Sequence, residues 1–169
     1  MGRERPLYYI PRYAILGEKQ TGTNSLQIAN VNLEDDGIYQ CQIGRTLEAR
    51  EVLSDLANVT ILIPPDRITL THVPPGLAIS GKEFQMNCEV TNTRPSPSFT
   101  WQTPLNTRIV NTTEVTQPMT PDSKLLKTIS TITLIADVSQ HGQEIKCEAT
   151  HIALNKSLEA TAIIAIDCK

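Results

Sequence analysis

The sequence has few of the residues on which catalysis, nucleic-acid binding and membrane insertion depend. It contains three histidines, and no two of them have metal-ligand spacing on one element. Lys and Arg number 15 against 18 Asp and Glu, so the net charge of −3 offers no basic surplus for phosphate contacts. No apolar run approaches the roughly 20 residues that span a bilayer. These absences argue against a nucleic-acid-binding protein and against a transmembrane helix within the sequence.

The motifs of enzyme and cofactor sites are missing as well. There is no G-x-S-x-G nucleophile elbow, no phosphate-binding loop, no H-E-x-x-H and no C-x-x-C pair. Carboxylates are concentrated in turns, where they usually cap backbone groups or face solvent. We therefore predict a protein that is not an enzyme and that needs neither a metal nor another cofactor.

Cysteines and glycosylation sequons indicate an oxidising, secretory environment. The cysteines are Cys41, Cys88, Cys147 and Cys168, and the three N-x-S/T sequons begin at Asn58, Asn111 and Asn155. The first eleven residues, however, have no apolar core of the kind that a secretory signal needs. We therefore expect the sequence to be a fragment, with Met1 lying inside a longer extracellular protein.

Short alternating segments between glycines and prolines predict strands in the first part of the chain. Residues 25–31, 39–43 and 57–63 alternate apolar and polar side chains. In the last of these, the alternation leaves Asn58 on the outward face. Pro64 and Pro65 end this strand because proline has no N–H for a ladder. A domain boundary here gives predicted domains at 1–63 and 64–169.

The second part of the chain repeats the strand pattern and predicts an all-β sandwich. Inward rows are expected at 84–90, 99–101, 130–134 and 145–149, and a final strand at 158–166. The polar residues 103–122 are expected to hold short edge strands and a loop. His141 and His151 are expected at the surface, at the ends of a strand.

Residues 35–41 match the D-x-G-x-Y-x-C motif of an immunoglobulin F strand. A tyrosine two residues before the cysteine, here Tyr39 before Cys41, can return its hydroxyl to the backbone of the preceding corner. Asp35 can pair with an arginine at the start of the D strand, and Arg12 occupies that place. The alternative is a chance acidic turn in front of a strand.

Cys88, Trp101 and Cys147 form the Cys…Trp…Cys framework of an immunoglobulin sandwich, and the second cysteine comes 59 residues after the first. A bridge over a loop of this length stabilises a fold by about 4 kcal/mol in the chain-entropy treatment. Ile145 stands where the corner tyrosine would be, which favours a C2-type domain. The prediction is thus two tandem immunoglobulin-like sandwiches.

The first of these two sandwiches is expected to be truncated to strands D to G. Residues 1–40 contain no cysteine to pair with Cys41 and no candidate for the earlier strands. Cys168 is also left unpaired on this scheme. A bridge between Cys41 and Cys168 stays open as an alternative.

The chain resembles the nephrin/kirre-type, irregular-chiasm-like immunoglobulin adhesion proteins. The resemblance rests on residues 11–17, 24–28, 33–36, 39–42 and 59–65. It implies a single-pass membrane protein with several immunoglobulin domains on the extracellular side of cell–cell junctions. It also implies that such proteins, the same or related, recognise one another on apposed cells, homophilically or heterophilically, through the CFG face of the first domain.

The candidate partner-binding residues lie on the predicted F strand and the F–G loop. Because Tyr39, Cys41 and Ile43 point inward, Gln40 and Gln42 should point outward, where their amides can bond reciprocally across a two-fold contact. The alternative is that both glutamines are merely solvated. The loop after Gly44 adds two further candidates, Arg45 and Glu48.

Three other functions fit the same sequence. A V-type domain followed by a C2-type domain also occurs in B7- and nectin-like receptor ligands. The two domains could be non-binding spacers in a larger extracellular protein. They could also be the immunoglobulin module of a secreted hydrolase whose catalytic domain lies elsewhere.

Overall fold

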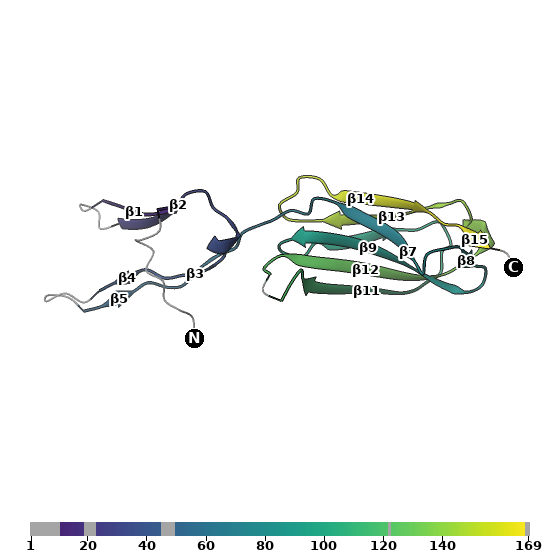
Figure 1. The fold of residues 1–169 in the computed structure, drawn as a ribbon, viewed down its shortest axis with the longest axis horizontal. Coiled ribbons are helices and arrows are strands. Elements are labelled where there is room, and N and C mark those ends of the chain that lie inside the picture. The colour runs from purple at the N-terminus through teal and green to yellow at the C-terminus, as the bar shows by residue number, and fades with distance from the viewer. Residues whose placement is uncertain (1–10, 19–22, 45–49, 122, 168–169) are drawn as a thin grey trace. The chain divides into compact units, whose positions relative to one another are not determined.

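The computed structural model describes residues 11–18, 23–44, 50–121 and 123–167. The chain divides into two compact units, Met1–Ile61 and Leu62–Lys169 (Figure 1). The first unit therefore ends at Ile61, close to the boundary that the prolines suggest.

The first unit contains two antiparallel ribbons, joined through a short 3-10 turn. One ribbon pairs β1 with β2, and the other pairs β3 with β6 and β4 with β5. The elements are β1 (Tyr13–Glu18), β2 (Thr23–Ile28), η2 (Leu33–Asp35), β3 (Gly37–Tyr39), β4 (Gln42–Ile43), β5 (Val52–Leu53) and β6 (Ala57–Val59). In immunoglobulin terms, the described strands of this unit correspond to D and E, then F and G.

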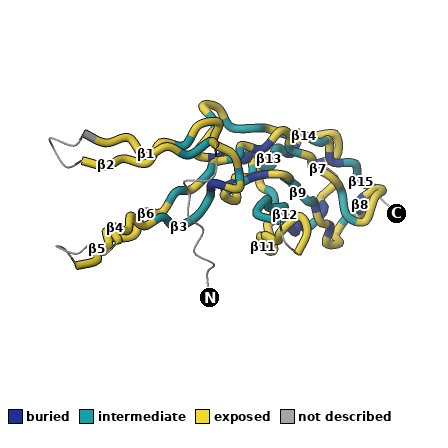
Figure 2. The backbone as a smooth tube through the Cα atoms, turned by 60° about the vertical axis from the view of Figure 1, so that its left-hand side comes forward, coloured by how far each residue is buried: buried dark blue, intermediate teal, exposed yellow. Residues whose placement is uncertain are grey.

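Most of the first unit is exposed (Figure 2). In the part of this unit that the structure describes, Asp35 is the one buried residue. Ile15 and Leu26 face each other across the β1–β2 ribbon, yet their side chains are 70% and 40% exposed. The apolar row that a complete sandwich would cover is therefore open to solvent, and a polar network at η2 takes the place of a core.

The second unit is a two-sheet sandwich. The four-stranded sheet has the order β11-β12-β9-β7, and the three-stranded sheet has the order β10-β13-β14. The elements are β7 (Ile68–Val73), β8 (Ala78–Ile79), β9 (Glu83–Thr93), β10 (Ser98–Gln102), β11 (Ile109–Pro118), β12 (Leu126–Ile135), η3 (Val138–Gln140), β13 (Glu144–Thr150), β14 (Leu158–Ile163) and β15 (Ile166–Asp167). These orders are those of strands D-E-B-A and C-F-G, as in a C2-type immunoglobulin domain.

The core of the second unit lies between its sheets. Phe84, Met86, Ile132, Leu134 and Ile145 are each at most 5% exposed. The expected disulfide is present: Cys88 on β9 and Cys147 on β13 are bonded, with their Cα atoms 6.3 Å apart. Trp101 lies directly opposite Cys147 on β10 and packs against the same core. The alternation of apolar residues in the sequence thus becomes the inner faces of two sheets.

Three strand predictions need correction. The polar stretch 103–122 holds one long edge strand, β11, in place of several short ones. The strand expected at 57–63 ends at Val59, and Ile63 instead exchanges two backbone hydrogen bonds of 2.8 Å with Arg94. The final strand breaks after Ile163, because Ala165 accepts a hydrogen bond from Ala78 and brings β15 beside β8 in parallel.

His151 is buried, at 4% exposed, and so is not the surface residue that its place in the sequence suggests. Its Nδ1 accepts a hydrogen bond from the Ala153 N–H at 3.1 Å. The proton therefore lies on Nε2, which donates to the Pro95 carbonyl at 3.2 Å. With both ring nitrogens paired, burial leaves no polar group unsatisfied. His141, by contrast, is exposed as expected.

Candidate functional site

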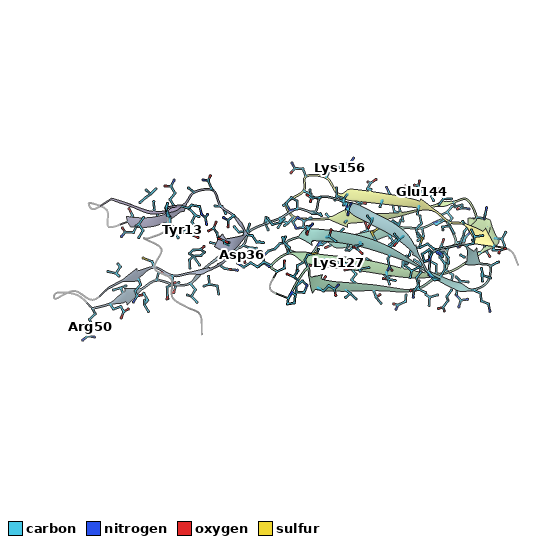
Figure 3. All side chains as sticks on the ribbon, in the orientation of Figure 1. Tyr13, Asp36, Arg50, Lys127, Glu144 and Lys156 are labelled. Atoms are coloured by element: carbon cyan, nitrogen blue, oxygen red, sulfur yellow. A yellow bond between two sulfur atoms is a disulfide. The ribbon has the colours of Figure 1, made fainter. Side chains whose placement is uncertain are left out.

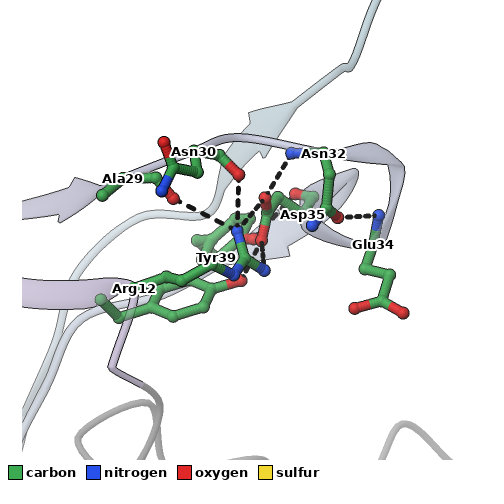
Figure 4. A network of polar contacts seen from close by, with 8 residues as sticks. Arg12, Ala29, Asn30, Asn32, Glu34, Asp35 and Tyr39 are labelled. Carbon is green, nitrogen blue, oxygen red and sulfur yellow. Dashed lines mark hydrogen bonds and ion pairs between the residues drawn. The ribbon is translucent and has the colours of Figure 1, made fainter.

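The corner between the two ribbons of the first unit is built on one buried carboxylate (Figure 4). Asp35, at the end of η2, is 0% exposed. The Arg12 guanidinium donates two hydrogen bonds to this carboxylate, at 2.9 and 3.0 Å, in a bidentate ion pair. Arg12 Nη1 also donates to the carbonyls of Asn30 and Ala29, at 3.0 and 3.3 Å. The arginine thereby links the start of β1 to the turn after β2.

Two tyrosines and an asparagine complete the network. The Tyr39 hydroxyl donates to the Asp35 carbonyl at 2.7 Å, which is the tyrosine corner of immunoglobulin domains. The Tyr13 hydroxyl donates to the Asp35 carboxylate. Asn32 caps the turn: its N–H donates to Asp35 at 2.7 Å, while its side chain accepts from the Glu34 N–H at 2.8 Å. The corner thus joins the first ribbon through charged hydrogen bonds to the carboxylate and the second ribbon through the Tyr39 hydroxyl.

The protonation states of the corner follow from these contacts. Hydrogen bonds from Arg12, then from Tyr13 and the Asn32 N–H, hold the pKa of Asp35 well below its usual range. The hydrogen bond to Asp35 raises the pKa of Tyr13 above its usual range, and the same carboxylate raises the pKa of Arg12. At neutral pH the corner therefore contains a fixed ion pair and a neutral phenol. The pKa shifts of Asp35, Tyr13 and Arg12 all lead away from neutrality, so these three groups are suited to holding geometry.

Gln40 and Gln42 are both exposed, and both amides have partners within the second ribbon. Gln40 Nε2 donates to the Ser54 carbonyl at 2.8 Å, and Gln42 Nε2 donates to the Glu51 carboxylate. Ser54 also makes two hydrogen bonds with Cys41, both at 2.9 Å. The Ser54 hydroxyl accepts from the Cys41 N–H, and the Ser54 N–H donates to the Cys41 carbonyl. The ribbon itself therefore orients both glutamines. Their amides are neither freely solvated nor left without a hydrogen-bond acceptor.

The outward side of this ribbon carries two large apolar side chains that the sequence reasoning missed. Gln42 lies opposite Leu53, and Ile38 lies opposite Asn58. Ile38 is 69% exposed and Leu53 is 55% exposed. The alternation that turns Tyr39 inward could have revealed Ile38. We call the surface formed by Ile38, Gln40, Gln42, Leu53 and Asn58 the F–G face; its ribbon runs toward Arg50 (Figure 3).

The other predicted site residues are distributed as follows. Arg45, Glu48 and Cys168 lie outside the described residues. Cys41 is exposed and forms no disulfide among the described residues. The sequon asparagines Asn58, Asn111 and Asn155 are all exposed.

Two absences can be stated for the described part of the chain. No group of three or more His, Cys, Asp or Glu residues there could hold a metal ion. In the same ranges, no helix has the length and apolar character needed to cross a bilayer.

The second unit has a neutral version of the same corner. Asp137 caps η3, and the Ser139 hydroxyl, with the Ser139 N–H, lowers the pKa of this carboxyl. The buried residue at the end of η3 is Gln140, 2% exposed. Its amide accepts from the Asp137 N–H at 3.2 Å and donates to the Thr107 hydroxyl at 3.4 Å. Asp35 and Arg12 of the first unit thus have Gln140 and Thr107 as their counterparts.

Comparison with known proteins gives the same architecture. The CD80-like C2-set immunoglobulin domain family matches residues 64–157. The chain is 27% identical to human Kin of IRRE-like protein 3 over 98% of its length, and 28% identical to the Drosophila melanogaster irregular chiasm C-roughest protein over 90%. Human nephrin is 27% identical over 92% of the chain. The chain spans 21%, 20% and 13% of these three relatives, respectively.

A solved structure is similar over both units. The crystal structure of Rst D1-D2 matches with a TM-score of 0.78 and 26% sequence identity. The match covers 98% of this chain and 80% of that chain.

Proposed function

Because the chain belongs to the CD80-like C2-set immunoglobulin family and is related to nephrin, Kin of IRRE-like and irregular chiasm proteins, we propose that it is a recognition module for cell–cell adhesion. Its partners in this proposal are immunoglobulin-superfamily adhesion proteins, the same or related, on apposed cells. It acts without catalysis, on the extracellular side of cell–cell junctions, as part of a longer single-pass membrane protein.

The observation that carries this proposal is the combined match over nearly the whole chain. Human Kin of IRRE-like protein 3 aligns over 98% of the chain, and the two-domain Rst structure superposes over the same share. A match to the second unit alone would favour any immunoglobulin protein. A match that also includes the first unit favours the nephrin/kirre group.

The F–G face is the proposed contact surface. It presents Ile38 and Leu53, both more than half exposed, together with the amides of Gln40 and Gln42. Protein interfaces combine an apolar central part with a polar rim, and this face offers side chains of both kinds. Since the ribbon already orients both glutamines, a partner orders few side chains on binding, and the entropic cost of association is small.

Asn58 shares this face, because it lies opposite Ile38. In the proposal, the three sequon asparagines carry N-linked glycans. A glycan on Asn58 would cover the end of the face that contains Ile38. The contact with a partner is therefore assigned to the other end, where Gln42 and Leu53 lie opposite each other.

The test compares one substitution at two exposed glutamines. The chain is displayed on cells with a secretion leader and a membrane anchor, and soluble copies of the chain and of human Kin of IRRE-like protein 3 are titrated onto the cells. Gln42→Arg introduces a bulky charge on the F–G face, and leaving polar groups unpaired at an interface costs about 1–3 kcal/mol. We expect binding to weaken by about tenfold or more.

Gln102→Arg is the matched control, because Gln102 is an exposed glutamine on β10 of the second unit. It should leave binding unchanged, and circular dichroism should show that both variants fold as the wild type does. If the wild type binds and Gln42→Arg binds equally well, the F–G face is not the contact surface.

A receptor ligand of the B7 kind is the second candidate. The CD80-like character of residues 64–157 favours it. In that case displayed chains bind neither one another nor the Kin of IRRE-like ectodomain, whatever residue stands at position 42.

A further inference from the structure

The strand β11 lies at an open edge of the four-stranded sheet (Figure 1). It pairs with β12 on one side, from Ile109 opposite Leu134 to Pro118 opposite Leu126. All ten of its residues are exposed. Its second side therefore presents a row of backbone N–H and C=O groups that another strand could pair with.

The other edges of the second unit are shorter or covered. β7, at the far edge of the same sheet, has six residues and lies beside β14. β10, at the edge of the other sheet, has five residues. Among the described strands of this unit, β11 is therefore the longest with one side open.

The sequence of β11 gives little protection against pairing with another chain. Six of its ten residues are β-branched: Ile109, Val110, Thr112, Thr113, Val115 and Thr116. A high β propensity with little charge is typical of segments that pair in the wrong way. The strand has no lysine, and its proline is the last residue, Pro118.

Glu114, the one charged residue of β11, disfavours only one register of pairing between two copies of the strand. When two copies pair antiparallel about Glu114, the two carboxylates lie opposite each other and repel. When the pairing shifts by one residue, each Glu114 lies opposite Thr113 or Val115, depending on the direction of the shift, and the repulsion is lost. Charge alone therefore leaves most registers of the strand open to a second copy.

Asn111 is placed where a larger group could cover this edge. It lies opposite Thr133, between positions that face Ile132 and Leu134, two core residues at 1% and 0% exposed. Because side chains alternate, Asn111 projects from the outer face of the sheet. The residue is exposed, and it begins the sequon completed by Thr113.

We propose that an N-linked glycan on Asn111 closes the edge of β11 against strand pairing with a second copy of the chain. A further strand would lie about 4.8 Å from β11, well within the space that a branched oligosaccharide occupies around its asparagine. The glycan obstructs every register in which a strand passes Asn111, including those that Glu114 permits.

The modification itself needs a lipid-pyrophosphate-linked oligosaccharide as the co-reactant. Asn111 Nδ2 forms a bond to the anomeric carbon of the first N-acetylglucosamine. The bond between that carbon and the pyrophosphate oxygen breaks, and lipid pyrophosphate and one amide proton are released. The bonded asparagine remains neutral, so the charge at the edge does not change.

The test uses the full chain, secreted by a glycosylating host with an added leader. Mass spectrometry should find a glycan on Asn111. Asn111→Gln should then self-associate as its concentration rises, as measured by sedimentation velocity, and the amides of β11 should exchange hydrogen about tenfold more slowly at high concentration. Asn155→Gln, the same change in the turn before β14, should behave as the wild type does.

A second variant separates edge pairing from other association. Val115 is 59% exposed on β11, so Val115→Lys adds a charge to the edge. Combined with Asn111→Gln, it should return self-association to the wild-type level. Any self-association through the apolar rows of the first unit would be equal in all variants. It therefore does not affect the difference in self-association between a variant and the wild type.

Three results would overturn the proposal. They are an unmodified Asn111 in the secreted wild type, an Asn111→Gln protein that associates no more than the wild type, and association that Val115→Lys does not reverse. None of these measurements depends on binding through the F–G face, so the adhesive function can fail while this inference stands.

Discussion

The hydrogen bond between Trp101 and Ser130 offers a direct measure of how the second unit is held together. Trp101 Nε1 donates to the Ser130 hydroxyl at 3.0 Å, and Ser130 is 0% exposed. Ser130 lies opposite Cys88, so the bond connects the three-stranded sheet to the other sheet beside the disulfide. Ser130→Ala removes the acceptor and leaves the indole N–H without this partner.

The expected loss of stability follows from the burial of the two groups. An unsatisfied buried donor costs about 1–3 kcal/mol, and the partial exposure of Trp101 favours the lower part of that range. We therefore expect Ser130→Ala to lower the free energy of unfolding by about 1–2 kcal/mol. For a domain of this size, that corresponds to a fall in Tm of about 4–12 °C.

Trp101 is the one tryptophan of the chain, so its fluorescence reports the unfolding of the second unit alone. Urea titration of the full chain gives the free energy directly. Ser98→Ala removes the same hydroxyl from an exposed position on β10 and should change stability by less than about 0.5 kcal/mol. If Ser130→Ala is as stable as Ser98→Ala, the indole hydrogen bond does not stabilise the sandwich.

Two further predictions concern the disulfide and the corner of the first unit. Replacing Cys88 and Cys147 together by alanine should lower the free energy of unfolding by about 4 kcal/mol, since the bridge closes a loop of 59 residues; a loss below about 1 kcal/mol in the same urea titration would contradict this. The raised pKa of Tyr13 means that its contribution to stability is complete below the ordinary tyrosine pKa and is lost as the pH rises through the folded value. In an alkaline titration followed by tyrosinate absorbance, Tyr13 should ionise above the ordinary tyrosine range, and Asp35→Asn should abolish this delay.

The fold of the second unit was predictable because its main features depend on local patterns. Alternating apolar residues give the inner faces of the sheets, and two cysteines with a tryptophan between them mark the disulfide that connects the two sheets. The strand β11 gave no such signal, because all its residues are exposed and neither face has to be apolar. The break before β15 and the burial of His151 depend on Ala78 and Pro95, which are distant in the sequence.

The same distinction applies to the candidate site. The spacing of Asp35, Tyr39 and Cys41 pointed to the corner because the motif reflects one turn and one strand. Tyr13 carried no signal, because its bond to Asp35 forms only when the turn η2 folds back onto the start of β1, 22 residues earlier in the sequence. Asn32, followed three residues later by Asp35, could have been recognised as a capping box.

The two corners differ in a way that matters for recognition. In the second unit, Gln140 is neutral and needs only the Asp137 N–H and the Thr107 hydroxyl, because the core and the disulfide already fix the sheets. In the first unit, the buried Asp35 carboxylate requires a cation and several donors, and burying it without them would be very costly. The donors to this carboxylate are Arg12, Tyr13 and the Asn32 N–H, which belong to the first ribbon and the turn after it. The second ribbon is held through Tyr39, whose hydroxyl donates to the Asp35 carbonyl, so polar contacts connect the ribbons of the first unit where apolar packing holds the second unit. The ribbon of the F–G face is tied to this corner through Tyr39 and Asp35. Under the proposed function, a change at Arg12 or Asp35 should therefore weaken partner binding without touching the contact surface.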